Sequence, residues 1–101
     1  MHGSFPVFVQ RPETRYGYVD LTATRRWIFG LFSGRTRIEF PHRQHYGNRV
    51  DVFDWKGQFR DSIRLDRDVF LIAVDSSGKR LYAVGGDSHP VIVSYPLNIQ
   101  D

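Results

Sequence analysis

The 101-residue sequence contains no cysteine. This absence excludes disulfide bonds, thiolate nucleophiles and cysteine-based zinc sites. The sequence also has no run of about 18 apolar residues, which is the length that a membrane-spanning helix needs. No apolar segment follows a basic N-terminus, so no signal peptide is predicted. A chain of this length is expected to form a single small domain, residues 1–101.

Lysine is also scarce, because twelve arginines stand beside only two lysines in a chain of net charge +3. Acidic residues are interspersed among these cations. A nucleic-acid binder of this size more often has a clustered basic face as well as a high pI. The composition therefore argues against nucleic acid as a partner.

The sequence does contain a repeat. Its first copy is YVDLTATRRWIFGLFSG (18–34) followed by NRVDVFDWKGQFRDSIRLD (48–66), and its second is VFLIAVDSSGKRLYAVGGD (69–87) followed by PVIVSYPL (90–97). Ile28 and Phe29 align with Leu81 and Tyr82, and residues 50–53 align with 91–94. A repeat at this spacing is typical of solenoids and propellers.

Strand patterns follow one another along both copies, and no helix is predicted. The segments 27–32 and 50–55 are apolar on both faces, which indicates sheets packed on both sides, whereas 59–66 alternates as an outer strand with one wet face should. The expected strands are 18–24, 26–33, 48–55 and 59–66, then 69–75, 80–85 and 90–96. We predict an all-β fold of two antiparallel propeller-type blades, 16–66 and 69–97, the second without its outer fourth strand.

Four phrases, YGYVDLTATRRWIFGLFSGRT, YGNRVDVFDWKGQF, IRLDRDVFLIAVD and RLYAV…VIVSYPL, resemble the C-terminal blades of the TolB-like six-bladed β-propellers. The resemblance covers roughly residues 16–97. It implies a six-bladed propeller fold and a cell-envelope or extracytoplasmic location, since these proteins are often predicted lipoproteins of unknown function. It carries over no catalytic residue, and we expect no enzyme activity. A full member would have more blades and an export signal, which this sequence does not show.

Two blades alone leave apolar surface uncovered, so a partner is expected. The N-terminal stretch 5–10 predicts an extra strand with Phe5, Val7 and Val9 on one face. Donated to a neighbouring chain, it would supply the missing fourth strand, and three copies would complete six blades as a homotrimer. The alternative is a truncated piece with an unfilled edge.

A cationic, aromatic loop inserted only in the first blade is the predicted binding surface. Loops on a rigid scaffold commonly carry binding, and this one could recognise an acidic glycan, a peptide or nucleic acid. A tolerated surface insertion is the alternative interpretation. The candidate residues are Arg35, Arg37, Phe40, His42, Arg43, His45, Tyr46 and Arg49.

The sequence gives little support for a metal site or for catalytic residues. His42 and His45 could share a metal ion, but no third ligand is evident, so no metal or cofactor is predicted. The adjacent residues 87–89 read Asp-Ser-His and predict a hairpin turn, because a catalytic triad converges from separate segments. Buried carboxylates can be catalytic, but Asp51, Asp54 and Asp75 are expected to accept hydrogen bonds from turn amides or neighbouring strands.

We therefore expect a non-catalytic binding or interaction module. Two alternatives remain. One is a fragment of a propeller hydrolase or lyase whose active residues lie outside this sequence. The other is a small basic binder of nucleic acid or acidic glycan, whose affinity would fall steeply with salt.

Overall fold

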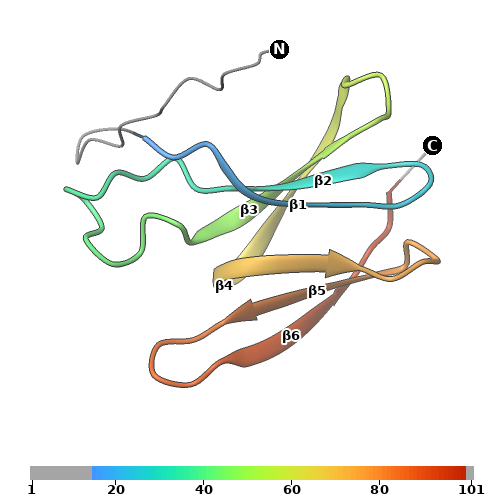
Figure 1. Ribbon diagram of the computed structural model, residues 1–101. Helices are drawn as coiled ribbons and strands as arrows, with labels where there is room; N and C mark the ends of the chain where they lie inside the picture. Colours follow the sequence, from blue (N-terminus) through green and yellow to red (C-terminus); the bar gives the residue numbers. More distant parts are fainter. Residues whose placement is uncertain (1–14, 100–101) are drawn as a thin grey trace, which may run out of the picture.

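The computed structural model describes residues 15–99, which form one antiparallel sheet of six strands in sequence order (Figure 1). No helix occurs among these residues, and the predicted all-β fold is confirmed. The predicted strand at 5–10 lies outside the described residues. The strands are β1 (Tyr18–Ala23), β2 (Ile28–Phe32), β3 (Gly47–Phe53), β4 (Phe59–Val74), β5 (Arg80–Gly85) and β6 (Val91–Pro96).

Strand β4 differs from the prediction, because the expected strands 59–66 and 69–75 form one continuous strand. Its first half pairs with β3 and its second half with β5. Arg49 lies opposite Arg64, but Gly47 lies opposite Val69, so β4 has extra residues between these pairs and the register shifts. No glycine or proline stands there to end a strand. The connection between the two blades is therefore an irregularity within a strand and not a turn.

The sheet curls until β1 lies against the second half of β4 (Figure 1). The Asp20 carboxylate accepts a hydrogen bond from the backbone N–H of Ile72 at 2.8 Å. Unit one thus comprises β1, β2, β3 and the first half of β4, and unit two comprises the second half of β4, β5 and β6. The core lies between the units and contains Phe29, Leu31, Val50, Val52, Leu65, Val69, Ile72, Leu81 and Ala83.

The two units share their hydrogen-bond register. Each inner strand has an irregularity at the same place, between Tyr18 and Asp20 in β1 and between Val69 and Leu71 in β4. Asp20 and Leu71 each follow the irregularity directly, so the next residues, Leu21 and Ile72, correspond to each other. This correspondence places the two copies of the repeat on the same backbone framework.

In the second strand of each unit, Ile28 corresponds to Leu81, as the sequence predicts. The predicted alignment of the third strands was wrong by one residue. Phe53 pairs with Ile28 and Tyr95 pairs with Leu81, so Val50 corresponds to Ile92 and not to Val91. The error arose because residues 91–93 are all apolar, so their pattern does not reveal which side chains share a face.

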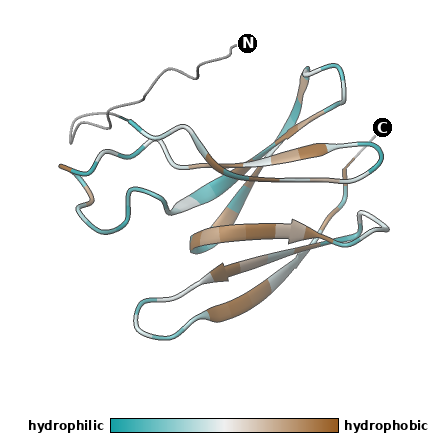
Figure 2. Cartoon of the chain, viewed as in Figure 1, coloured by the Kyte–Doolittle hydropathy of each residue, from teal (hydrophilic) through white to brown (hydrophobic). Residues whose placement is uncertain are grey.

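Each unit leaves one sheet face uncovered by the other unit, because side chains alternate along a strand and only the inner faces meet in the core. Leu21 is 63% exposed on unit one and Ile92 is 72% exposed on unit two. The sequence predicted that the central strands are buried on both faces. In the structure, each unit covers one face of the other, and the second face of each unit stays uncovered. Figure 2 shows hydrophobic stretches along β4, β5 and β6 and mostly hydrophilic connections between strands.

The two exposed faces are named after the half of the chain that forms them. The N-face belongs to unit one and comprises Tyr18, Leu21, Ile28, Gly30, Phe32, Asp51, Phe53 and Phe59. The C-face belongs to unit two and comprises Leu71, Ala73, Tyr82, Val84, Ile92 and Ser94.

Candidate functional site

The predicted binding loop connects β2 to β3 and packs over the place where the two units join. The guanidinium of Arg35 donates to the Asp68 carboxylate of β4 at 2.7 Å. The ring of Tyr46 packs edge-on against Phe70, with 5.2 Å between ring centroids. The loop therefore ties unit one to unit two.

Two arginines of the β2–β3 loop, Arg35 and Arg43, are engaged in contacts within the protein. Only 13% of the Arg35 side chain is exposed, and its guanidinium also lies 4.5 Å from the ring centroid of Phe40. Arg43 forms an ion pair with Asp87 and lies over the Tyr46 ring. Nearby acids thus offset both charges, which leaves less positive charge available to a ligand than the sequence indicated.

The eight predicted residues do not form one patch. Arg49 lies on β3, pairs with Asp51 and stacks over Phe32, on the N-face. Arg35, Phe40, Arg43, His45 and Tyr46 do gather around the loop through the contacts above and a 4.7 Å ring contact of His45 with Tyr46. Arg37 is half-buried and His42 is exposed in the same loop. Ligand capture by this loop stays a prediction.

The metal and triad candidates have ordinary surroundings. Within residues 15–99, no three His, Asp or Glu side chains lie close enough to hold a metal ion together. His45 packs against Tyr46 and Phe70. Residues 87–89 lie in the connection between β5 and β6, as the sequence predicts.

Asp51 is the polar centre of the N-face. Its buried carboxylate accepts hydrogen bonds from Tyr18 Oη at 2.6 Å, Arg49 Nε at 3.1 Å and Ser62 Oγ at 3.0 Å. Burial, followed by the hydrogen bond to Asp51, raises the pKa of Tyr18 to about 12. A larger residue at position 30 would force the Tyr18 ring to shift, because a Cβ there would lie 2.7 Å from Tyr18 Cδ1. Both oxygens of Asp51 are engaged in holding β1, β3 and β4 together.

The other two acids close turns, as predicted. Asp54 Oδ1 accepts from the amides of Lys56 and Gln58, each at 2.9 Å. Asp75 Oδ1 accepts from the amide of Lys79 at 2.9 Å. Partial burial acts to raise the pKa of Asp75, but the turn amides outweigh it and hold that pKa below its ordinary value. Both carboxylates therefore stabilise hairpin turns.

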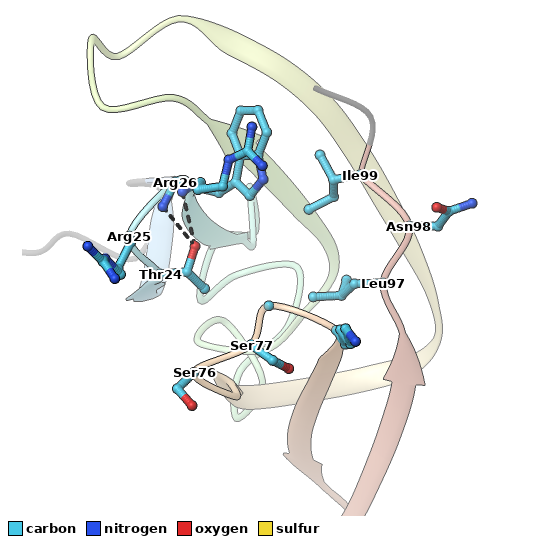
Figure 3. Close-up of a pocket in the computed structure, with 11 residues that line it drawn as sticks. Thr24, Arg25, Arg26, Ser76, Ser77, Leu97, Asn98 and Ile99 are labelled. Carbon is cyan, nitrogen blue, oxygen red and sulfur yellow. Dashed lines mark hydrogen bonds between the residues drawn. The ribbon is translucent and has the colours of Figure 1, made fainter.

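A cavity of about 360 Å³, drawn in Figure 3, lies between turns at the end of the sheet opposite the β2–β3 loop (Figure 1). Its walls are the β1–β2 turn, the β4–β5 turn and the segment after β6. Sequence reasoning missed it because the three segments are far apart in the chain. The available signal was the pair of equivalent turns, each rich in hydroxyl and basic residues. The polar lining residues are Thr24, Arg25, Arg26, Ser76, Ser77, Lys79 and Asn98.

Comparison with known protein families gives a match over most of the chain. The family described as TolB-like 6-blade propeller-like matches residues 6–77, which is most of the chain. The chain belongs to this family. Comparison with curated proteins and with solved structures gives no significant match. Membership agrees with the arrangement of the two units, whose inner strands lie side by side as in adjacent blades. Among residues 15–99, no helix is long and apolar enough to cross a membrane.

Proposed function

We propose that this propeller chain is a non-catalytic interaction module whose N-face binds the C-face of another copy. One observation carries the proposal. The exposed faces correspond, position by position, to the two faces that are buried against each other inside the chain. An N-face placed against a C-face would therefore reproduce a contact that this fold already makes.

The N-face is the counterpart of the buried face of unit two. Leu21 corresponds to Ile72, which is 7% exposed, and Ile28 corresponds to Leu81, which is fully buried. Both counterparts lie in the core between the units. The N-face thus has the strand register of a surface that packs on a preceding blade.

The C-face is the counterpart of the buried face of unit one. Tyr82 corresponds to Phe29, and Ile92 corresponds to Val50, both of which are fully buried. Large contiguous apolar surfaces on monomers commonly mark interaction sites. Two such surfaces of complementary type on one chain favour a head-to-tail contact.

A head-to-tail contact closes into a ring when its rotation allows. Three copies of two units would give six, the blade number in the description of the family. The outer edge of β6 pairs with no strand among the described residues, so it can accept one. The segment with Phe5, Val7 and Val9 is our candidate donor from a neighbouring copy.

Location and ligand complete the proposal. Family membership supports a cell-envelope or extracytoplasmic location. Phe40 and His42 are exposed in the β2–β3 loop, and they support a contact there with a glycan or peptide. This contact would be secondary to assembly, because the arginines of the loop mainly hold the two units together.

Light scattering coupled to size exclusion tests the assembly. We expect the chain, of 11.8 kDa, to elute with three times its own mass. Leu21→Asp should reduce that mass to one chain, whereas Lys56→Gln, which changes the net charge by the same −1 in an exposed turn, should leave the trimer intact. A monomeric wild-type chain at high concentration would refute self-assembly and would favour further blades of a longer polypeptide as the covering.

A further inference from the structure

We propose that the cavity between the β1–β2 and β4–β5 turns binds the phosphate group of a small molecule. The site lies where the two units meet, at the end of the molecule remote from the β2–β3 loop (Figure 3). The proposal rests on the walls of the cavity, on its donors and on its charge. It does not depend on self-assembly.

The walls are held by contacts between the three segments. Gly78, with a φ of 73°, brings the β4–β5 turn against the β1–β2 turn, so that a Cβ at this glycine would lie 3.8 Å from Thr24 Cγ2. The carbonyl of Lys79 accepts a hydrogen bond from the amide of Leu97 at 2.8 Å, which fixes the third wall. The cavity is therefore framed by backbone that is already hydrogen-bonded.

Hydroxyl groups supply neutral donors. Thr24 Oγ1 accepts from the amides of Arg26 at 3.2 Å and Trp27 at 3.1 Å (Figure 3). Since both contacts use the oxygen as an acceptor, the hydroxyl hydrogen of Thr24 is available to donate. Ser76 adds an exposed hydroxyl from the facing turn. Each of the two turns thus contributes a hydroxyl group to the lining of the cavity.

The charge of the lining is positive. Arg25, Arg26 and Lys79 line the cavity, and no carboxylate does so among the residues that the structure describes. Asp75, which precedes the lining residue Ser76, accepts from the amides of Lys79 and Arg80.

An aromatic ring helps to place one of these cations. The guanidinium of Arg26 lies 5.8 Å from the ring centroid of Trp27, and that of Arg60 lies 5.4 Å from it. Such contacts favour a guanidinium held near the ring face. Arg26 is thereby held against Trp27, which also lines the cavity.

This donor set suits a phosphate group. A phosphate carries nearly two negative charges at neutral pH and presents at least three acceptor oxygens, whereas a carboxylate presents two and carries one charge. Arginine and lysine side chains form strong charge-assisted hydrogen bonds to phosphate oxygens. The cavity is open and large enough for a phosphate monoester as well as for the free ion.

An NMR titration of the full chain at low salt tests the site. Inorganic phosphate and glycerol 3-phosphate are added separately, with acetate as the carboxylate comparison. We expect saturable shifts of the amides of Thr24, Ser76 and Gly78 with either phosphate and weaker effects with acetate. Tighter binding of glycerol 3-phosphate would identify a monoester as the ligand, and equal binding would identify the free ion. Unsaturated shifts spread over all basic residues would indicate an adventitious ion only and would overturn the proposal.

A pair of variants separates this site from general positive charge. The double variant Arg25→Gln/Lys79→Gln should weaken phosphate binding by about tenfold or more, because two charge-assisted hydrogen bonds are lost. Lys56→Gln removes an exposed cation from the β3–β4 turn, outside the cavity, and should leave affinity unchanged. Arg25 and Lys79 are exposed, so thermal stability should not fall. Unchanged affinity in the double variant, or an equal loss in the control, would overturn the site.

Discussion

Unit one and unit two have the same strand register but opposite patterns of burial. Leu21 and Ile72 hold equivalent positions, yet Leu21 is largely exposed and Ile72 is buried. On the other faces the order is reversed, since Val50 is fully buried and its counterpart Ile92 is exposed. At these four apolar positions, exposure is therefore set by whether a neighbouring unit is present, and not by the residue type.

The units differ in their polar content, which makes the N-face distinctive. Asp51 and its partner Tyr18 occupy positions where unit two has Val93 and Val69. The internal contact is thus wholly apolar at these positions, while the N-face adds a hydrogen-bonded carboxylate among aromatic rings. A contact made by the N-face would share the geometry of the internal one and add polar specificity to it.

The largest expected change in the free energy of unfolding comes from comparing equivalent residues in the second strands of the two units, β2 and β5. Phe29→Ala should lower the free energy of unfolding by about 3–5 kcal/mol, because it opens a cavity in the core. Tyr82→Ala, at the equivalent exposed position, should change it by about 0.5 kcal/mol or less in the monomer. Urea unfolding at low protein concentration measures both. Equal losses would show that the C-face is already covered within one chain.

The next pair of variants lies in the inner strands, β1 and the second half of β4. Ile72→Ala should cost about 2–5 kcal/mol of unfolding free energy, again through a core cavity. Leu21→Ala should change monomer stability by about 0.5 kcal/mol or less and should weaken association instead. The comparison breaks down if Leu21→Ala destabilises the monomer as strongly as Ile72→Ala does.

The polar centre of the N-face should give a smaller loss. Asp51→Asn removes the charge that Tyr18, Arg49 and Ser62 all contact and should cost about 1–3 kcal/mol. Asp61→Asn, an exposed neighbour on β4, is the matched control and should have little effect. Thermal unfolding of both variants measures the difference, and equal shifts in Tm would argue against a special role for Asp51.

The smallest effect concerns alkaline pH. Burial and the bond to Asp51 raise the pKa of Tyr18 from 10.0 to about 12, so the fold favours the neutral phenol. The resulting stabilisation is complete below the unfolded pKa and is lost as the pH rises from 10.0 towards about 12. In unfolding measurements across this range, Tyr18→Phe should therefore lose less stability than wild type. Burial and the hydrogen bond to Asp66 also raise the pKa of Tyr95, so Tyr95→Phe should likewise lose less stability at alkaline pH than wild type.

The sequence predicted the repeat, the all-β fold and most of the strand positions, because apolar periodicity and turn residues report on local backbone. It also aligned Ile28 with Leu81 correctly, since the apolar runs around these residues match position by position. It misplaced the third strands, because three consecutive apolar residues at 91–93 do not show which side chains share a face. It predicted a break near residue 67 that the structure replaces by a register shift within β4, since strand propensity there is uninterrupted.

The sites were less predictable than the fold. The loop was correctly recognised as cationic and aromatic, but pairing of Arg35 with Asp68 and of Arg43 with Asp87 depends on tertiary contacts that sequence spacing does not reveal. The cavity between the turns was missed for the same reason. Two turns in different repeats become neighbours only once the sheet has curled.

The central claim is that the N-face and C-face are complementary to each other, and mixing two blocked variants tests it most directly. Leu21→Asp blocks the N-face and Ile92→Asp blocks the C-face, so each variant alone should have the mass of one chain by light scattering. Their equimolar mixture retains one intact face of each kind, and it should form a one-to-one complex of twice that mass. A mixture that stays monomeric, or single variants that keep the wild-type mass, would contradict the head-to-tail contact.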